Sequence, residues 1–172
     1  MDIRRVRVAE APAFQALRLK ALAEYPADFG SDHATAAGRP LSFFVSALID
    51  NHVMGAFDSG ALVGIVGIQF LQNIKERHRA YIFGVYARGR GVARQLMLAA
   101  LREAFTRVTQ VELNVRVGNT AAERLYQGLG FVTCGGIPGI HQVDGVLYDD
   151  STMVLTRARY LAMLSGAWVS NV

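Results

Sequence analysis

The segment YARGRGVARQLM, residues 86–97, places three arginines and two glycines where a strand is expected to give way to a helix. A turn of this kind exposes backbone N–H groups that have no partner inside the helix, at the positive end of the helix dipole. Because Gly89 and Gly91 carry no Cβ, an anion can approach the backbone closely. The pattern therefore predicts a cradle for phosphate groups. The positive charge around it comes from Arg88, Arg90 and Arg94.

This turn alone leaves other interpretations open. It is neither a GxxxxGK[ST] nor a GxGxxG motif, so a solvated turn with surface arginines is one alternative. A basic patch for nucleic acid is another. The arginines open an amphipathic helix, however, and are not interleaved with exposed aromatic residues, which disfavours nucleic acid as a partner.

A second motif, LNVRVGNTAAERLYQGLGF, occupies residues 113–131 and predicts a strand followed by a helix. Thr120 and Glu123 form a capping box, which favours Thr120 as the N-cap of that helix. Gly130 stands where a left-handed residue is expected after the helix ends. Asn119 would then lie just before the helix, with its side-chain amide free for a ligand.

Together, the two motifs resemble the coenzyme signature of the GNAT superfamily of acyl-CoA-dependent N-acyltransferases. Residues 88–93, RGRGVA, match R/Q-x-x-G-x-G/A, and residues 113–131 match its strand–Asn–helix–Tyr–Gly-Phe unit. The stretch LRLKALAEYPADFGSD is similar to the first helices of many small bacterial members. The resemblance covers residues 3 to 156, approximately.

The resemblance implies acetyl-CoA as cosubstrate, with its pyrophosphate on the amides of the glycine turn and its pantetheine arm between two parallel strands. Tyr126, seven positions after Asn119 and nearly on the same helix face, would donate a proton or a hydrogen bond to the departing thiolate. The alternative for Tyr126 is a packing residue with an apolar ring and a wet hydroxyl. The implied coenzyme-binding residues are Val85, Tyr86, Arg88, Gly89, Arg90, Gly91, Val92, Ala93, Arg94, Asn119 and Tyr126.

The sequence departs from the family pattern just before the turn. Only Ala87 separates Tyr86 from Arg88, where family members usually carry a few more residues. Either the strand ends early or the turn is tightened, and the contacts of Val85 and Tyr86 depend on which is true.

A general base is not identified either. The strand AYIFGVY contains no Asp or Glu. Glu76, Tyr81 and Glu112 are near it in sequence, and each is interpreted as a surface or packing residue.

The elements that position these motifs predict a mixed α+β fold. It has a mainly antiparallel central sheet flanked by helices on both faces. A tight hairpin is expected at Asp58-Ser59-Gly60. The other expected strands are Ile3–Val8, 80–86, 111–117, 131–133 and 148–155. The expected helices begin at about Ala11 and cover 41–49, 92–105, the segment from Thr120 and a part of the tail after 156.

Length and composition favour one domain over residues 1–172. The resemblance implies that it is an N-acetyltransferase domain, with a core at about 3–156 and a tail at 157–172. A net charge of +4 favours anionic partners. The longest apolar run is too short to span a bilayer, so no membrane partner is expected. The N-terminus, MDIRRVRVAE, has no continuous apolar segment, so no secretory signal is expected. The lone Cys134 suits a reducing cytoplasm and is expected in the core. The four histidines lack metal-ligand spacing, so no metal is expected.

The leading interpretation is an N-acetyltransferase acting on a primary amine, from a small molecule or a peptide, by direct attack on the thioester. The alternative is an acyl-CoA-binding sensor without turnover. The acceptor pocket is expected between the loop of Phe29, Ser31, Asp32 and His33 and the late loop IPGIHQVDGVLYDD, in which His141 would pair with Asp144. The apolar tail around Leu161, Leu164 and Trp168 could pack on its own sheet or form a homodimer.

Overall fold

The computed structural model describes residues 1–166, and these form two compact units. Unit 1 comprises Met1–Gln69 and Ile82–Glu103. Unit 2 comprises Phe70–Tyr81 and the described residues from Ala104 onward. The boundary therefore falls inside one strand, after Tyr81.

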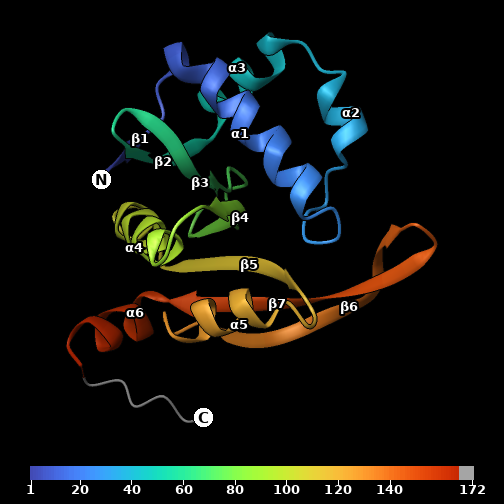
Figure 1. Cartoon of the computed structure of the whole chain (residues 1–172). Coiled ribbons are helices and arrows are strands. Elements are labelled where there is room, and N and C mark those ends of the chain that lie inside the picture. Colours follow the sequence, from blue (N-terminus) through green and yellow to red (C-terminus); the bar gives the residue numbers. More distant parts are fainter. Residues whose placement is uncertain (167–172) are drawn as a thin grey trace. The chain divides into compact units, whose positions relative to one another are not determined.

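The strands of residues 1–166 are β1 (Asp2–Arg5), β2 (His52–Asp58), β3 (Ala61–Phe70), β4 (Arg79–Ala87), β5 (Gln110–Arg116), β6 (Val132–Val143) and β7 (Val146–Thr156). Their order in the sheet is β1-β2-β3-β4-β5-β7-β6 (Figure 1). β4 pairs with β5 in parallel, whereas β1 with β2, β2 with β3, β5 with β7 and β6 with β7 pair antiparallel. The predicted mixed, mainly antiparallel α+β fold is confirmed.

The helices of the same residues are α1 (Ala11–Glu24), α2 (His33–Ala37), α3 (Leu41–Asp50), α4 (Val92–Ala104), α5 (Thr120–Gln127) and α6 (Arg157–Leu164). A short 3-10 helix, Val8–Glu10, precedes α1. Within this described part of the chain, no helix is long and apolar enough to cross a lipid bilayer. The helices predicted after Ala11, over 41–49 and over 92–105 are confirmed to within a residue or two.

In unit 1, the two faces of the strands pack against different helices (Figure 1). Phe14 of α1 and Leu48 of α3 belong to one buried cluster with Ile65 of β3. Gly64, the neighbour of Ile65, points to the opposite face because side chains alternate along a strand. A Cβ on Gly64 would lie 2.7 Å from Cδ1 of Leu96, so α4 approaches β3 directly there.

The hairpin between β2 and β3 follows the sequence prediction. Its two-residue turn consists of Ser59 and Gly60, with φ angles of 49° and 84°. Two successive left-handed residues are the signature of a type I′ turn, whose twist matches the flanking strands. The predicted hairpin is therefore confirmed.

Unit 2 contains a long hairpin that the sequence analysis missed. The segment 137–150, expected to be a loop, belongs instead to the paired strands β6 and β7, coloured orange to red in Figure 1. Their turn is Asp144-Gly145, with φ angles of 49° and 81°. The strands predicted at 131–133 and 148–155 are confirmed, but β6 and β7 are longer than predicted. The length of β6 was missed because glycines and a proline interrupt its apolar alternation.

Three smaller expectations have different outcomes. Val8 begins the 3-10 helix, so the first strand is shorter than predicted. Cys134 is exposed, with its Sγ 3.5 Å from the carbonyl oxygen of Thr152, and the expectation that it is a core residue was wrong. The tail helix is confirmed as α6, whereas Trp168 lies outside the described residues.

A bidentate ion pair ties β4 to β5 within unit 2. Arg79 donates from Nη2 to Oε2 of Glu112 at 2.6 Å and from Nε to Oε1 of the same carboxylate. Arg79 also donates to Glu76 at 3.1 Å. The hydrogen bonds from Arg79 hold the pKa of Glu112 below its ordinary value of 4.5. Folding therefore favours the charged form of Glu112.

We expect Glu112→Gln to lower the free energy of unfolding by about 1–2 kcal/mol at pH 7, since the side chains of Arg79 and Glu112 are only 29% and 13% exposed. Because the folded pKa is depressed, the stabilisation is present above pH 4.5 and is lost as the pH falls below it. Urea denaturation at pH 7 and at progressively lower pH measures this difference. Glu76→Gln, which removes the more exposed partner of Arg79, is the control and should cost less. A pH-independent loss in Glu112→Gln would contradict the assignment.

Candidate active site

The glycine turn in unit 1 connects β4 to α4 through only four residues, 88–91. β4 extends to Ala87, and the amide of Arg88 still donates to the carbonyl oxygen of Val63 at 2.9 Å. Gly89 and Gly91 then adopt φ angles of 98° and 78°, which only glycine reaches without strain. Of the two explanations for the short connection, the structure therefore shows a tightened turn and no early end of the strand.

Several amides of this turn have no hydrogen-bond partner among residues 1–166. Val92 donates to Gly89 at a long 3.4 Å, whereas the amides of Gly89, Arg90 and Gly91 donate to no group within the described chain. These N–H groups stand at the N-terminus of α4, where the helix dipole favours an anion. Around them, the exposed arginines are Arg88, Arg90 and Arg94. The arrangement can bind a phosphate group through backbone hydrogen bonds and positive charge.

β4 carries a conformational irregularity next to the residues expected to contact the pantetheine arm. Gly84 has a φ of 64° in the middle of the strand, a feature that the sequence analysis did not single out. A left-handed glycine inside a strand is typical of a bulge, which re-aims neighbouring backbone groups. Val85 follows it and is half-buried.

Tyr86 is buried, and its side chain is already engaged in unit 1. Its hydroxyl donates to Oε2 of Glu24 at 2.6 Å, and its ring lies 6.2 Å from that of Tyr25. Burial and the nearby Glu24 carboxylate raise the pKa of Tyr86 to about 12. Tyr86 therefore stays protonated at neutral pH, and its backbone is the part best placed to contact a ligand.

In unit 2, Tyr126 belongs to α5 and Asn119 directly precedes that helix. Asn119 is itself the N-cap, since its side chain accepts a hydrogen bond from the amide of Ala122 at 3.2 Å. The predicted capping box with Thr120 was wrong: Glu123 instead accepts from the amide of Gly118 at 3.2 Å. The Oδ1 of Asn119 thus caps the helix, and its Nδ2 is the group that can donate to a ligand.

Tyr126 is a buried residue with 6% of its surface exposed. Its ring makes an edge contact with Phe131, with 6.0 Å between the ring centroids. The end of α5 is followed by Gly130, whose φ of 92° confirms the predicted left-handed residue. The side chain of Tyr126 is therefore held in one position by packing.

A buried carboxylate in unit 2 was also missed. Asp150 of β7 is 7% exposed, and its Oδ2 lies 3.5 Å from Nε2 of His141 on β6. The predicted partner of His141 was Asp144, which instead forms the hairpin turn. Recognition of the Asp-Gly turn would have placed His141 and Asp150 on neighbouring strands. A carboxylate beside an imidazole can accept a proton.

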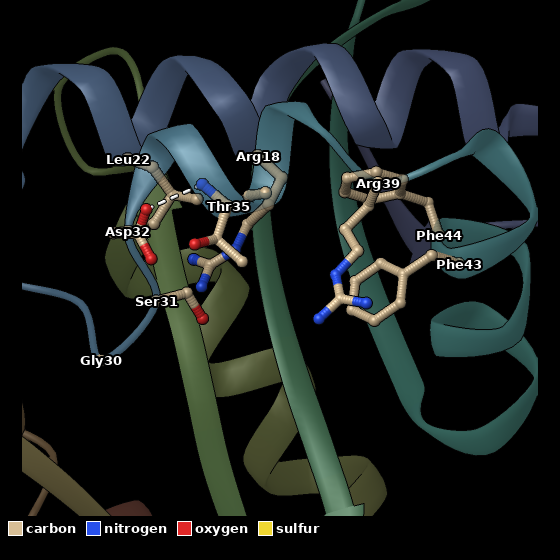
Figure 2. A pocket seen from close by; sticks show the side chains of 10 residues that line it. Arg18, Leu22, Gly30, Ser31, Asp32, Thr35, Arg39, Phe43 and Phe44 are labelled. Carbon is tan, nitrogen blue, oxygen red and sulfur yellow. Dashed lines mark hydrogen bonds between the residues drawn. The ribbon is translucent and has the colours of Figure 1, made fainter.

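A pocket of about 290 Å³ lies within unit 1, between α1, α2 and α3 (Figure 2). Ser31 and Asp32 line it, as the sequence predicted for the acceptor site. The guanidinium of Arg18 lies over the ring of Phe29, with Cζ 4.7 Å from the ring centroid. His33 is exposed and does not line the pocket. The predicted second wall, the late loop, is the β6–β7 hairpin of unit 2 and is not part of this pocket.

Comparison with known proteins gives one family. Residues 12–131 match the model of the acetyltransferase (GNAT) family. The N-alpha-acetyltransferase RimI of Mycobacterium tuberculosis is 36% identical over 99 residues, which cover 55% of this chain and 61% of that relative. The chain therefore spans less than two thirds of the length of that relative.

Solved structures give the same fold. A GNAT-family acetyltransferase of Streptococcus pneumoniae has a TM-score of 0.79 at 23% identity, covering 90% of this chain and 98% of that one. A Salmonella typhimurium protein, described as a putative acetyltransferase with its cofactor acetyl-CoA, has a TM-score of 0.77 at 21% identity. The match covers 91% of this chain and 93% of the Salmonella protein.

We expect Asn119→Ala to lower the free energy of unfolding by about 1 kcal/mol, because it removes the side-chain acceptor of the α5 N-cap. Asn119→Asp retains an acceptor at the same position and should be close to wild type in stability. Chemical denaturation of the two variants tests the assignment. Equal losses would mean that the side chain stabilises the fold by some other contact.

Proposed function

The chain belongs to the acetyltransferase (GNAT) family, and from this we propose that it moves the acetyl group of acetyl-CoA to a primary amine. The observation that carries the proposal is the row of unpartnered amides at Gly89, Arg90 and Gly91, at the N-terminus of α4. The 36% identity to an N-alpha-acetyltransferase supports it. The Salmonella relative described with acetyl-CoA supports the choice of coenzyme.

In this proposal, the pyrophosphate of acetyl-CoA binds the amides of residues 89–93. Arg88, Arg90 and Arg94 add charge around it. The pantetheine arm runs along β4 past Val85 and Tyr86 and is contacted by Nδ2 of Asn119. Since the Tyr86 hydroxyl is bound to Glu24, the backbone of Tyr86 serves the arm and its side chain supports the strand.

The amine nitrogen attacks the thioester carbonyl carbon, so that a C–N bond forms and the C–S bond breaks. Backbone N–H groups stabilise the oxyanion, and the thiolate leaves with a proton from the hydroxyl of Tyr126. The proton lost by the amine needs an acceptor. Asp150, buried beside His141, is the carboxylate that the structure adds as a candidate.

The wider proposal concerns the whole protein. We propose that residues 1–172 act as one N-acetyltransferase domain in the cytoplasm, with a core at about 3–156 and a tail from 157. The acceptor is a small-molecule or peptide amine. The M. tuberculosis relative is named an N-alpha-acetyltransferase, which supports an α-amine as acceptor. A homodimer through the tail around Leu161 and Leu164, which are exposed, belongs to the same proposal.

We expect Gly91→Ala to weaken acetyl-CoA binding by about tenfold or more, because its Cβ would project where the backbone must approach the phosphates. Gly91 has a φ of 78°, and a Cβ there meets nothing within 4 Å in the free protein. Gly60→Ala is the matched control, since Gly60 has a φ of 84° and equally open surroundings. Thermal denaturation should show that both variants lose similar stability, and calorimetric titration with acetyl-CoA should show that only Gly91→Ala loses affinity. Equal affinities would place the coenzyme elsewhere.

We expect Tyr126→Phe to lower kcat by about 10²-fold, since it removes the proposed proton donor and keeps the ring in its packing site. The dissociation constant of acetyl-CoA should stay within about threefold of wild type. Thiol release during turnover and calorimetric binding give the two quantities. Tyr160→Phe, which alters another buried tyrosine of unit 2, should leave kcat unchanged. An unchanged kcat in Tyr126→Phe would remove this residue from the chemistry.

A further inference from the structure

Arg18 of α1 has an unsatisfied hydrogen-bond donor inside unit 1. Its Nη1 exposes less than 1 Å² and has no hydrogen-bond partner in the described chain. The guanidinium lies over the ring of Phe29, and burial lowers its pKa from 12.5. Buried polar groups are almost always hydrogen-bonded in native proteins, and an exception indicates a group that something else satisfies. Arg18 is therefore a candidate for contact with a ligand.

The pocket beside Arg18 carries a net positive charge. Figure 2 shows the guanidinium of Arg18 lying toward Ser31 and Thr35. Arg39, the second arginine of the lining, sits over the ring of Phe43. Asp32 is the only carboxylate among the described lining residues, and its Oδ1 already accepts from the amide of Thr35 at 2.7 Å. An anionic ligand in this pocket would therefore lie near two arginines and one carboxylate, and that carboxylate already caps α2.

The position of Arg18 relates the pocket to β4. A Cβ placed on Gly84 would lie 3.4 Å from Nη1 of Arg18, so the guanidinium lies against the irregular point of the strand. Gly84 directly precedes Val85 and Tyr86, along which the pantetheine arm is proposed to run. A small ligand held by Arg18 would thus lie next to this segment of β4.

We propose that the pocket binds an acceptor that bears a carboxylate, and that Arg18 pairs with this carboxylate to hold the acceptor amine beside Gly84. The inference rests on the proposed acetyl transfer and names its substrate class. A guanidinium presents a planar fork of donors that matches a carboxylate bidentately. The volume of about 290 Å³ suits a ligand of amino-acid size, and Leu22, Phe43 and Phe44 offer apolar surface for its side chain.

The test compares leucine, leucinamide and isoamylamine as acceptors with saturating acetyl-CoA. These three amines share the same apolar side chain. Leucine carries a carboxylate on the carbon next to the amine, leucinamide carries a neutral carboxamide there, and isoamylamine carries only hydrogen. At equal pH, leucinamide offers more neutral amine than leucine, so a preference for leucine cannot come from amine basicity. We expect kcat/KM for leucine to exceed that for the other two by at least about tenfold. Equal kcat/KM values would overturn the proposal while leaving acetyl transfer intact.

Variants of Arg18 test whether this residue causes the preference for leucine. Arg18→Gln should remove the preference for leucine, and Arg18→Lys should keep part of it, since a lysine retains charge without the fork. Arg39→Gln removes the other cation of the same pocket and should reduce the preference less than Arg18→Gln does, because the guanidinium of Arg39 lies over the ring of Phe43. The dissociation constant of acetyl-CoA should be unchanged in all three variants. If Arg18→Gln weakens the coenzyme instead, Arg18 serves a coenzyme phosphate and the proposal fails.

A binding measurement separates this inference from the proposed function. If no amine is acetylated, leucine is titrated calorimetrically into the wild type and into Arg18→Lys and Arg18→Gln, with thermal melts to confirm folding. Binding that weakens in the order wild type, Arg18→Lys, Arg18→Gln supports the carboxylate site even if transfer is absent. No leucine binding to the folded wild type would overturn it.

Discussion

The tight connection between β4 and α4 is the constraint on which this account depends. Because Arg88 is still hydrogen-bonded to β3, the chain must reverse into a helix over the next three residues. It does so through left-handed backbone at Gly89 and Gly91, which side chains would disfavour. The consequence is a set of amides that the fold leaves unpaired at the positive end of a helix. The geometry that closes the turn is thus the same geometry that can hold an anion.

The acceptor side of the molecule follows a related principle. Arg18 and Gly84 meet because a glycine occupies the irregular point of β4 and leaves room for the guanidinium. Nη1 then exposes less than 1 Å² and has no hydrogen-bond partner among residues 1–166. In both regions the fold leaves hydrogen-bond donors unsatisfied, and ligands would complete them. The coenzyme would accept hydrogen bonds from backbone amides, whereas the carboxylate of the amine substrate would accept them from a side chain.

Much of the fold could be predicted because its signals are local. The apolar spacing of α1, α3 and α4 and the Ser59-Gly60 turn each depend on a few neighbouring residues. The β6–β7 hairpin was missed because glycines and a proline weaken the strand pattern, although Asp144-Gly145 is a strong turn signal. The N-cap was misplaced by one residue because Asn119 and Thr120 are both good capping residues, and sequence alone does not decide between them.

The site was predictable only where backbone chemistry defines it. Glycine spacing predicts the anion-binding turn, since the amides are present in any sequence that adopts it. The roles of Arg18 and Asp150 depend on burial, which arises from elements distant in the sequence. Neither residue stands in a motif, and each becomes a candidate only when its surroundings are known.

The most direct test of the central claim is an amide chemical-shift titration of the ¹⁵N-labelled protein with coenzyme A. We predict that the backbone amides of Gly89, Arg90 and Gly91 shift most strongly and saturate together, because they donate to the diphosphate. Binding that leaves these three amides unmoved, or the absence of any binding, would contradict the account.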